Sequence, residues 1–387
     1  MLNIFRQTST ALSAKEIAPD LLCTCFVAQT GGLAINAALL ALSLRETHGT
    51  MLQILAGVPN QAADCGSLKE EEVALLEALD VQLIEIENPI SSDYKVANKI
   101  GCLDKALEVT NRPYLAFLDS DIVCLAPICS PISEEWDVAV KPVDIANRGK
   151  NKGVWKKLYE ICNTKMPNKY LQATVTGERM LPYYNSGFIL IKTAQAGNFG
   201  RYWATIAQKC YAAKQDNPDI IIGDESSLSP MKRIINIDQF SLPIAIQSLD
   251  LRTYILDERW NFPLNFRSAI PSDTMIVHYH NTESFFAVPV LRELWFYACH
   301  KYPNFLQLAE SIKNTDEHRA VMLLRCYPIK QSKLVRQEFT RDDGKGIPPG
   351  TQQRKLFSKT ISKIRTLLRR NHLIYKLYLK LKPKTKV

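Results

Sequence analysis

Apolar residues along the first third of the chain are spaced alternately as in strands and as in helices. Residues 21–28 form a short, nearly continuous apolar run, which is typical of a strand covered on both faces. After a polar break at residues 29–32, apolar side chains recur at helical spacing, at Leu33, Ala37, Leu40 and Leu44. This helix ends near Gly49, and residues 51–58 form a second strand-like run. The pattern predicts a β-α-β unit.

The same alternation continues up to residue 118. It predicts an acidic helix over residues 68–79, a strand over 81–86, a helix with Val96, Ile100, Leu103 and Leu107 on its apolar side, and a strand over 114–118. Alternating strands and helices favour an α/β fold with a mostly parallel, doubly wound central sheet flanked by helices. Ligands of such sheets bind beyond the carboxyl ends of the strands, and Asp119-Ser120-Asp121 stands at one such end.

The bulk composition is that of a globular protein with a large core. The 387 residues are 46% hydrophobic. No stretch reaches the ~20 apolar residues that span a bilayer, and the N-terminal segment lacks the features of a signal peptide. We therefore expect a cytoplasmic protein. The ten cysteines are scattered without a CxxC pair, which favours reduced, buried thiols over disulfides.

The basic net charge belongs to the C-terminal tail. From Gly344 onward the chain has 13 Lys and Arg and no Asp or Glu, so the total of +9 leaves residues 1–343 with a net charge of −4. The charge therefore says nothing in favour of nucleic-acid binding by the body of the protein, and no nucleic-acid partner is expected.

Two carboxylates close together follow the strand at residues 114–118. Because alternate residues of an extended chain point to the same side, Asp119 and Asp121 can face one site. Neighbouring carboxylates repel each other unless a cation neutralises them, and hard oxygen ligands suit Mg²⁺ or Mn²⁺. A metal ion that bridges a diphosphate is the expected occupant. The alternative is a solvated turn without a ligand.

Further motifs follow one another between about Leu21 and Glu283. They are Ser43-Leu44-Arg45-Glu46-Thr47, Asn98-Lys99, the Asp-Ser-Asp triplet, Tyr184-Asn185-Ser186-Gly187-Phe188, Gly223-Asp224-Glu225-Ser226-Ser227-Leu228, Arg259-Trp260-Asn261-Phe262-Pro263 and Ile276-Val277-His278-Tyr279. In their order and spacing they resemble the GT-A-fold glycosyltransferases, in particular glycosyltransferase family 8 and its relatives. The resemblance implies a GT-A, Rossmann-like sheet and transfer of a sugar from a nucleotide-diphosphate donor.

The resemblance also implies the residues of a metal site. Asp119 and Asp121, with Ser120 between them, would bind the metal and the donor ribose, and a late histidine would complete the metal shell. His278 matches that histidine, and His280 is the second choice. The family's Gly-x-x-Lys-Pro-Trp continuation is absent after His278. The alternative for His278 is a histidine on a buried strand with a satisfied hydrogen bond.

A second group of residues is expected around the donor. A strand is predicted over residues 187–192, and the Asn185-Ser186-Gly187 motif stands where this strand begins. By resemblance these three residues would contact the donor sugar, and a β-bulge or turn without a ligand is the alternative. Lys99 could neutralise a donor phosphate, although surface lysines commonly only face water.

The acceptor side has its own candidates. The candidate catalytic residues are Asp224, Glu225 and Asn185, near which the acceptor would bind. Asp224 or Glu225 could take the proton of an acceptor hydroxyl if the reaction inverts, or position the sugar if it retains, and N-capping of a helix is the alternative. The resemblance favours retention. Trp260 and Asn261 could stack on and hydrogen-bond an acceptor sugar, unless the tryptophan is a buried anchor of its loop.

These motifs suggest a domain organisation. We expect one GT-A-like domain over residues 1–341, with a nucleotide-binding half at about 20–136, an acceptor-side half at about 137–283 and a helical part at 284–326. A Gly/Pro-rich linker at 342–353 precedes a basic amphipathic tail at 354–387. Such a tail can lie on an anionic membrane, which would place the protein at the inner face of the membrane. A helix packed on the body, or a partly disordered solubilising tail, is the alternative.

The function predicted from the sequence is metal-dependent transfer of a sugar from a nucleotide-diphosphate donor to a hydroxyl of a glycan or lipid-linked acceptor, in the synthesis of cell-surface glycans or glycolipids. One alternative is a catalytically silent module that attaches to membrane or nucleic acid through its tail. A second is a metal-dependent nucleotidyl or phosphoryl transferase. The sequence has no P-loop, and position 123 is Val where an Asp-x-Asp-x-Thr phosphatase motif needs threonine, so the second alternative is disfavoured.

Overall fold

The computed structural model describes residues 14–60, 67–133, 135–146, 152–216, 236–267 and 269–311. The chain divides into two compact units, and everything described below lies in the first, which spans residues 1–265 and 270–326. The predicted linker at 342–353 and the tail at 354–387 lie outside the described residues.

The first half has the strand and helix alternation that the apolar pattern predicts. The elements in chain order are β2 (Leu22–Val27), α1 (Gly32–His48), β3 (Gln53–Pro59), α3 (Glu70–Ala78), β4 (Gln82–Ile86), α4 (Asn98–Val109) and β5 (Tyr114–Leu118). All but one of the residues of β2 are buried, because helices cover both faces of the sheet at this strand. The predictions for this part of the chain are confirmed to within a few residues at each boundary.

Seven strands make up the central sheet, in the order β12-β8-β11-β5-β2-β3-β4. The second half of the chain contributes β8 (Val138–Pro142), β11 (Tyr184–Lys192) and β12 (Thr253–Ile255). All neighbours are parallel except that β11 runs antiparallel to both β5 and β8. The predicted α/β fold with a mostly parallel central sheet flanked by helices is confirmed.

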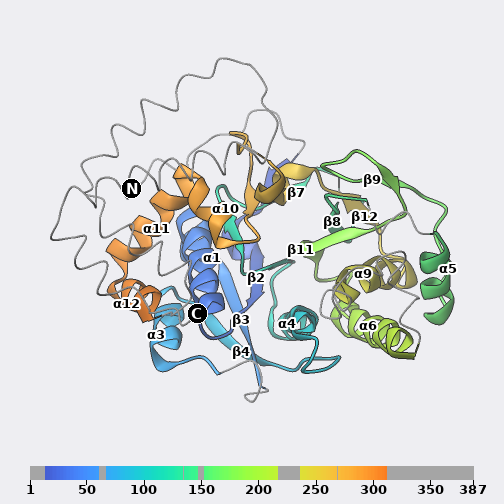
Figure 1. Ribbon diagram of the computed structural model, residues 1–387, viewed down its shortest axis with the longest axis horizontal. Helices are drawn as coiled ribbons and strands as arrows, with labels where there is room; N and C mark the ends of the chain where they lie inside the picture. Colours follow the sequence, from blue (N-terminus) through green and yellow to red (C-terminus); the bar gives the residue numbers. More distant parts are fainter. Residues whose placement is uncertain are drawn as a thin grey trace, which may run out of the picture. The chain divides into compact units, whose positions relative to one another are not determined.

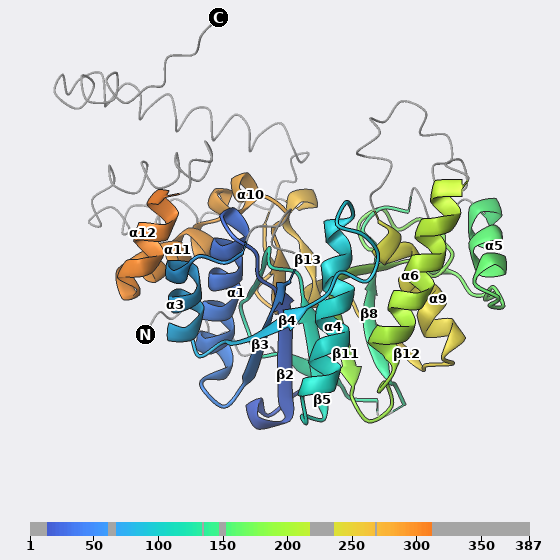
Figure 2. The ribbon, with the colours of Figure 1, turned by 90° about the horizontal axis from the view of Figure 1, so that it is seen from below.

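Each face of the sheet has its own hydrophobic core. Alternate residues of β2 divide between the two, with Leu22 and Phe26 in one core and Cys23 and Cys25 in the other. The first core is covered by α1, α3 and α11 (Pro289–Lys301), and the second by α4, α6 (Phe199–Asp216) and α9 (Ile237–Ser248). Figure 1 labels these helices, and Figure 2 shows α4 and α6 side by side along the strands.

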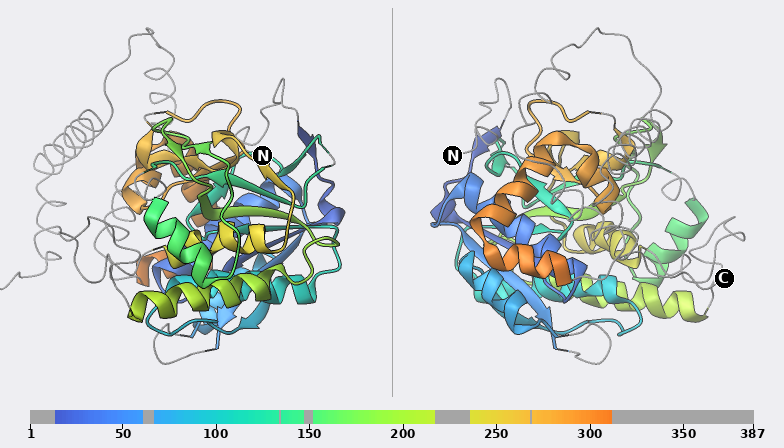
Figure 3. Two further views of the ribbon diagram at one scale, coloured as in Figure 1. Left: turned by 90° about the vertical axis from the view of Figure 1, so that its right-hand side faces the viewer. Right: turned by 60° about the vertical axis from the view of Figure 1, so that its left-hand side comes forward.

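The C-terminal part of the described chain, up to residue 311, is mostly helical. Helices α10 (Thr282–Ala287), α11 and α12 (Pro303–Ser311) follow one another, and the last two pack beside α1, as Figure 3 shows in orange and blue. No helix among the described residues is long and apolar enough to cross a bilayer. The eight described cysteines are free, and six of them are buried.

A small three-stranded sheet brings distant parts of the chain together beside the main sheet. Its order is β13-β14-β6, with bounds Phe262–Pro263, Ile276–His278 and Ile122–Cys124. β14 runs antiparallel to β6, and His278 is paired with Ile122. This pairing places the late histidine directly beside the turn that carries the two aspartates.

Candidate metal centre and donor site

The Asp119-Ser120-Asp121 turn joins β5 to β6, and its backbone is fixed from two sides. The amide of Asp119 donates to the carbonyl of Gly187 on β11 at 2.8 Å, and the amide of Tyr279 donates to the carbonyl of Asp121 at 3.1 Å. The two carboxylates are 23% and 28% exposed. The triplet is therefore held between two sheets, which is not the arrangement of a freely solvated turn.

Asp119, Asp121 and His278 form a cluster that could hold a metal ion. Their ligand atoms all lie within 4.8 Å of one another, and Nε2 of His278 lies 3.1 Å from Oδ1 of Asp121. Two ligands at right angles around an ion, with bonds of ~2.1 Å, lie about 3 Å apart, and opposite ligands lie about 4.2 Å apart. Two carboxylates and one neutral imidazole are an acceptable donor set for Mn²⁺, and the carboxylates by themselves also suit Mg²⁺. The residues therefore fit a divalent cation.

His280, the second choice for this role, lies next to His278 but is engaged elsewhere. Its Nδ1 lies 3.0 Å from the carbonyl oxygen of His278, and the two rings stack with centroids 3.8 Å apart. Burial, and then the charge of His278, lower the pKa of His280 to about 4. The metal-ligating cluster found among the described residues does not include it.

The surroundings shift the pKa values of Asp119, Asp121 and His278 in different ways. Burial, helped by the nearby Asp121, raises the pKa of Asp119 above its ordinary value in spite of Lys99. Burial acts in the same direction on Asp121, but the charge of His278 and its hydrogen bond prevail and hold the pKa of Asp121 below its usual range. Burial disfavours a charge on His278, yet Asp121 raises the pKa of this imidazole. The site is thus built to hold positive charge next to Asp121.

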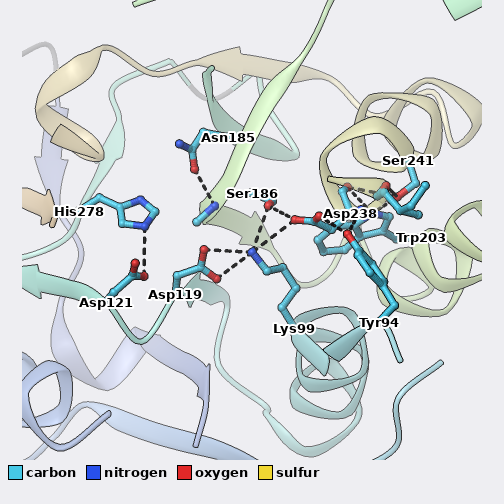
Figure 4. A network of polar contacts seen from close by, with 12 residues as sticks. Tyr94, Lys99, Asp119, Asp121, Asn185, Ser186, Trp203, Asp238, Ser241 and His278 are labelled. Carbon is cyan, nitrogen blue, oxygen red and sulfur yellow. Dashed lines mark hydrogen bonds and ion pairs between the residues drawn. The ribbon is translucent and has the colours of Figure 1, made fainter. Parts of the chain in front are cut away.

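Lys99 is the second source of positive charge at the site. It lies at the start of α4, is 9% exposed and reaches three oxygen partners with its Nζ, as Figure 4 shows. These are a carboxylate oxygen of Asp119 at 2.9 Å, Oγ of Ser186 at 3.2 Å and a carboxylate oxygen of Asp238 at 3.4 Å. Lys99 is therefore a buried member of the site and not a surface lysine.

Asp238 is a residue of this site that the sequence analysis missed. It is 2% exposed in the first turn of α9 and accepts hydrogen bonds from the hydroxyls of Tyr94, at 2.7 Å, and Ser186, at 2.5 Å. An acid in the first turn of a helix is ordinarily explained by the helix dipole, so the sequence offers no local signal that it belongs to a site. Its partners come from segments 52 and 144 residues away.

The Asn185-Ser186-Gly187 motif lies inside β11, whereas the sequence analysis placed it before a strand that begins at about Gly187. The register between β11 and β8 shifts between Asn185 and Ile189, so this part of the strand contains the irregularity typical of a β-bulge. Because successive residues point to opposite sides of a strand, Asn185 is directed towards His278 and Ser186 towards Lys99, as seen in Figure 4. The backbone of Gly187 lies against the ring of His278.

Trp260 and Asn261 are buried, at 3% and 0% exposure. The Trp260 ring packs near Phe188, with centroids 6.5 Å apart, which is the arrangement expected of the alternative interpretation as a loop anchor. Asn261 donates from Nδ2 to Oδ1 of Asn185 at 3.2 Å and contacts Nδ1 of His278 at 3.1 Å. A role of either residue in acceptor binding stays a prediction.

Comparison with known proteins identifies the family. The model of the Rhodobacterales glycosyltransferase domain matches residues 24–250, more than half of the chain. The protein belongs to this glycosyltransferase family. No curated protein matches its sequence.

Solved structures that match this glycosyltransferase include the galactosyltransferase LgtC in complex with donor and acceptor sugar analogues. The identity is 15% and the TM-score 0.43, with 76% of this chain and 97% of that chain covered. A second is the glycosyltransferase GlyE of Streptococcus pneumoniae, at 13% identity and a TM-score of 0.38, with 73% of this chain and 60% of that chain covered.

The family match covers only part of the site of this glycosyltransferase. It includes Asp119, Asp121 and Asp238, and it ends before His278. The predicted catalytic residues Asp224 and Glu225 fall inside the matched range but lie outside the described residues.

The loop that follows β2 is also held in place at this end of the sheet. The Glu72 carboxylate, 1% exposed, accepts hydrogen bonds from the Thr30 hydroxyl at 3.0 Å and the Gly31 amide at 2.8 Å. Gly31 has φ +78°, a conformation that favours glycine. β2 lies between β3 and β5 in the sheet. Helix α1, which follows β2, covers one face of the sheet, and α4, which precedes β5, covers the other. Such a switch point in the strand order is where a ligand-binding crevice is expected.

Proposed function

We propose that this glycosyltransferase binds a nucleotide-diphosphate sugar through a divalent cation, Mn²⁺ or Mg²⁺, held by Asp119, Asp121 and His278. The observation that supports the proposal is the convergence of these three side chains within 4.8 Å at the carboxyl end of β5, beside the loop that leaves β2. The nucleoside would lie towards that loop and the diphosphate towards the metal.

The chemistry of transfer requires stabilisation of the departing nucleoside diphosphate. A bound divalent cation supplies a Lewis acid that neutralises the charge developing on this leaving group. Lys99 adds a fixed positive charge on the opposite side of Asp119, and Asp238 and Ser186 keep its Nζ in place. The burial of these groups strengthens their interactions with a charged ligand.

The remaining roles follow from the sequence predictions. Asn185, Ser186 and Gly187 would border the donor sugar, and Asp224 or Glu225 would position the sugar or take the proton of the acceptor hydroxyl. We propose hexosyl transfer with retention of configuration, on the family resemblance. Trp260 and Asn261 would shape the acceptor side. The acceptor would be a glycan or a lipid-linked glycan, and residues 354–387 would bring the enzyme to an anionic membrane at the cytoplasmic face.

The test is a thermal-shift screen of UDP, GDP, CDP and their sugar conjugates, with and without Mn²⁺, followed by a transfer or donor-hydrolysis assay with the donor that binds. We expect one nucleotide to raise the melting temperature only with the metal, and Asp121→Ala to abolish this effect and the activity. Asp93→Ala, an exposed aspartate, serves as the control. If no nucleotide stabilises the wild type, the donor site is wrong. Salt-sensitive binding to vesicles or nucleic acid that persists in Asp121→Ala would then favour the silent binding module.

A further inference from the structure

A row of buried polar side chains leads away from the candidate metal ligand His278 into the interior. Its members are Asp144, Asn185, Asn261 and His278, which are 6%, 7%, 0% and 5% exposed. Nδ2 of Asn185 donates to Asp144 at 3.4 Å, and Oδ1 of Asn185 accepts from Asn261 at 3.2 Å. Oδ1 of Asn261 lies 3.1 Å from Nδ1 of His278. We call the side chains of Asn185 and Asn261 the amide relay.

The direction of every hydrogen bond in the amide relay is set by one backbone group. The Gly187 amide can only donate, and it lies 2.8 Å from the Asn185 side chain, so the atom that it meets is the oxygen Oδ1. The other end of the Asn185 side chain, the NH₂ group, then faces the Asp144 carboxylate, which accepts. Both contacts require the same orientation of the Asn185 amide.

The orientation of the Asn261 amide follows from that of Asn185. Its side chain meets Oδ1 of Asn185, which has no proton, so the Asn261 atom there must be the donor nitrogen. The opposite end of Asn261 is therefore a carbonyl oxygen, and it faces Nδ1 of His278. A carbonyl oxygen accepts, so Nδ1 of His278 must hold a proton.

From this we propose that Asn185 and Asn261 are positioning residues that fix the Nδ1-protonated tautomer of His278, so that the lone pair of Nε2 is presented beside Asp121 for the metal. This inference rests on the proposed metal centre. It assigns to the two asparagines a role that differs from direct contact with donor or acceptor. Partners that orient a metal-binding histidine typically change metal affinity 10- to 100-fold when they are removed.

The far end of the amide relay is anchored by charge. Asp144 pairs with the fully buried ammonium of Lys141 and accepts a hydrogen bond from Thr174 at 2.8 Å. A carboxylate held in this way keeps the NH₂ group of Asn185 turned towards it, because a flipped amide would place two acceptors face to face. The relay therefore cannot reverse without losing hydrogen bonds at both Asp144 and Gly187.

The first test is the tautomer itself. Ring-¹⁵N histidine labelling marks only six residues, and the His278→Gln variant assigns the signal by its absence. In the metal-free wild type both ring nitrogens face an acceptor, because Nε2 lies 3.1 Å from the Asp121 carboxylate. The measurement is therefore made on the metal-free Asp121→Ala variant, at a pH where the ring is neutral, and we expect the proton of His278 on Nδ1. A proton on Nε2 would overturn the relay. This measurement does not depend on metal binding, so it separates the relay from the proposed metal centre, which fails if the wild type binds no Mn²⁺.

The second test separates orientation from simple packing. Asn261→Leu removes the acceptor that faces Nδ1, and we expect the dissociation constant of Mn²⁺, measured by calorimetry, to rise 10- to 100-fold. Asn261→Asp keeps an acceptor towards Nδ1 while losing the bond to Asn185, so we expect it to retain metal affinity within about 3-fold although it is less stable. Thr24→Val, which removes a buried hydroxyl elsewhere in the sheet, is the matched control. Equal affinity in the leucine variant and the wild type would contradict the proposal.

Discussion

Gly187 has no room for a side chain, and the reason lies in the ring of His278. A Cβ atom at position 187 would lie 2.6 Å from Cε1 and 2.9 Å from Nδ1 of His278, closer than side-chain atoms approach each other. The two residues are brought together by strands β11 and β14, which belong to different sheets.

We expect Gly187→Ala to weaken Mn²⁺ binding by about 10-fold or more, because the displaced ring moves Nε2 away from Asp121. Calorimetric titration with Mn²⁺ measures this. Gly197→Ala is the matched control, since a Cβ atom there would meet nothing within 4 Å. Unchanged affinity in Gly187→Ala would mean that His278 does not bind the metal.

His48 is a buried histidine outside the site. Its Nε2 accepts a hydrogen bond from the Ile128 amide at 2.8 Å, so the ring must be neutral at this nitrogen, and burial lowers its pKa to about 4. In the unfolded chain the pKa is about 6.5. Between these two values the unfolded state binds more protons than the folded state, so the free energy of unfolding rises with pH in this window.

We expect His48 to cost the folded protein about 3 kcal/mol as the pH falls from about 6.5 to 4. Urea unfolding of the wild type and of His48→Gln across this window measures the effect. Glutamine can accept the Ile128 hydrogen bond but does not titrate, so the variant should lose less stability on acidification. Parallel pH profiles of the two proteins would contradict the assignment.

Among the secondary structure elements, α4 is tied to three others by one side chain. Lys99 reaches Asp119 after β5, Ser186 on β11 and Asp238 on α9, so a single ammonium links α4 to all three of these elements. The position of Lys99 on a helix is readable from the local pattern. Its burial is not, since lysines on amphipathic helices commonly face water.

We expect Lys99→Met to lower the free energy of unfolding by about 3–5 kcal/mol in EDTA, because the buried carboxylate of Asp238 and the partly exposed carboxylate of Asp119 lose their partner. Adding Mn²⁺ should restore more stability in this variant than in the wild type, because a cation at Asp119 replaces part of the lost charge. Urea unfolding with EDTA and with Mn²⁺ gives both numbers. Lys105→Met, at an exposed ion pair with Glu108, should change stability by less than ~1 kcal/mol. Similar losses in the two variants would show that Lys99 is not a structural charge.

In the second half of the sheet the sequence predicts the bounds of the strands less accurately. β11 begins at Tyr184, three residues before the predicted strand, because pairing of Tyr184 and Asn185 with β8 extends it through the polar motif. Polar residues at a strand end look like a turn in the sequence. Here they are strand residues whose side chains find buried polar partners outside the central sheet, Ser186 in Asp238 of α9 and Asn185 in Asn261 before β13.

For the protein as a unit, the order of the amino acids was enough to predict the alternating α/β architecture and the place of Asp119 and Asp121 at a strand end. Both depend on the burial of residues a few positions apart, and this leaves a local pattern of apolar side chains. His278 was found only through the resemblance to a family. The family match covers residues 24–250 and therefore does not include that histidine.

Long-range packing of the folded chain was needed for the rest of the site. The contacts of Asp238 with Tyr94 and of His278 with Asp121 join residues 144 and 157 positions apart, and the amide relay joins Asn185 to Asn261 across 76 positions. Such contacts follow from the order in which strands pair and from the antiparallel direction of β11 and β14. Each of these polar residues has an ordinary local explanation as a cap, a turn or a surface group. Their place in the site depends on hydrogen bonds to partners that are distant in the sequence, so a local pattern of residues cannot reveal it.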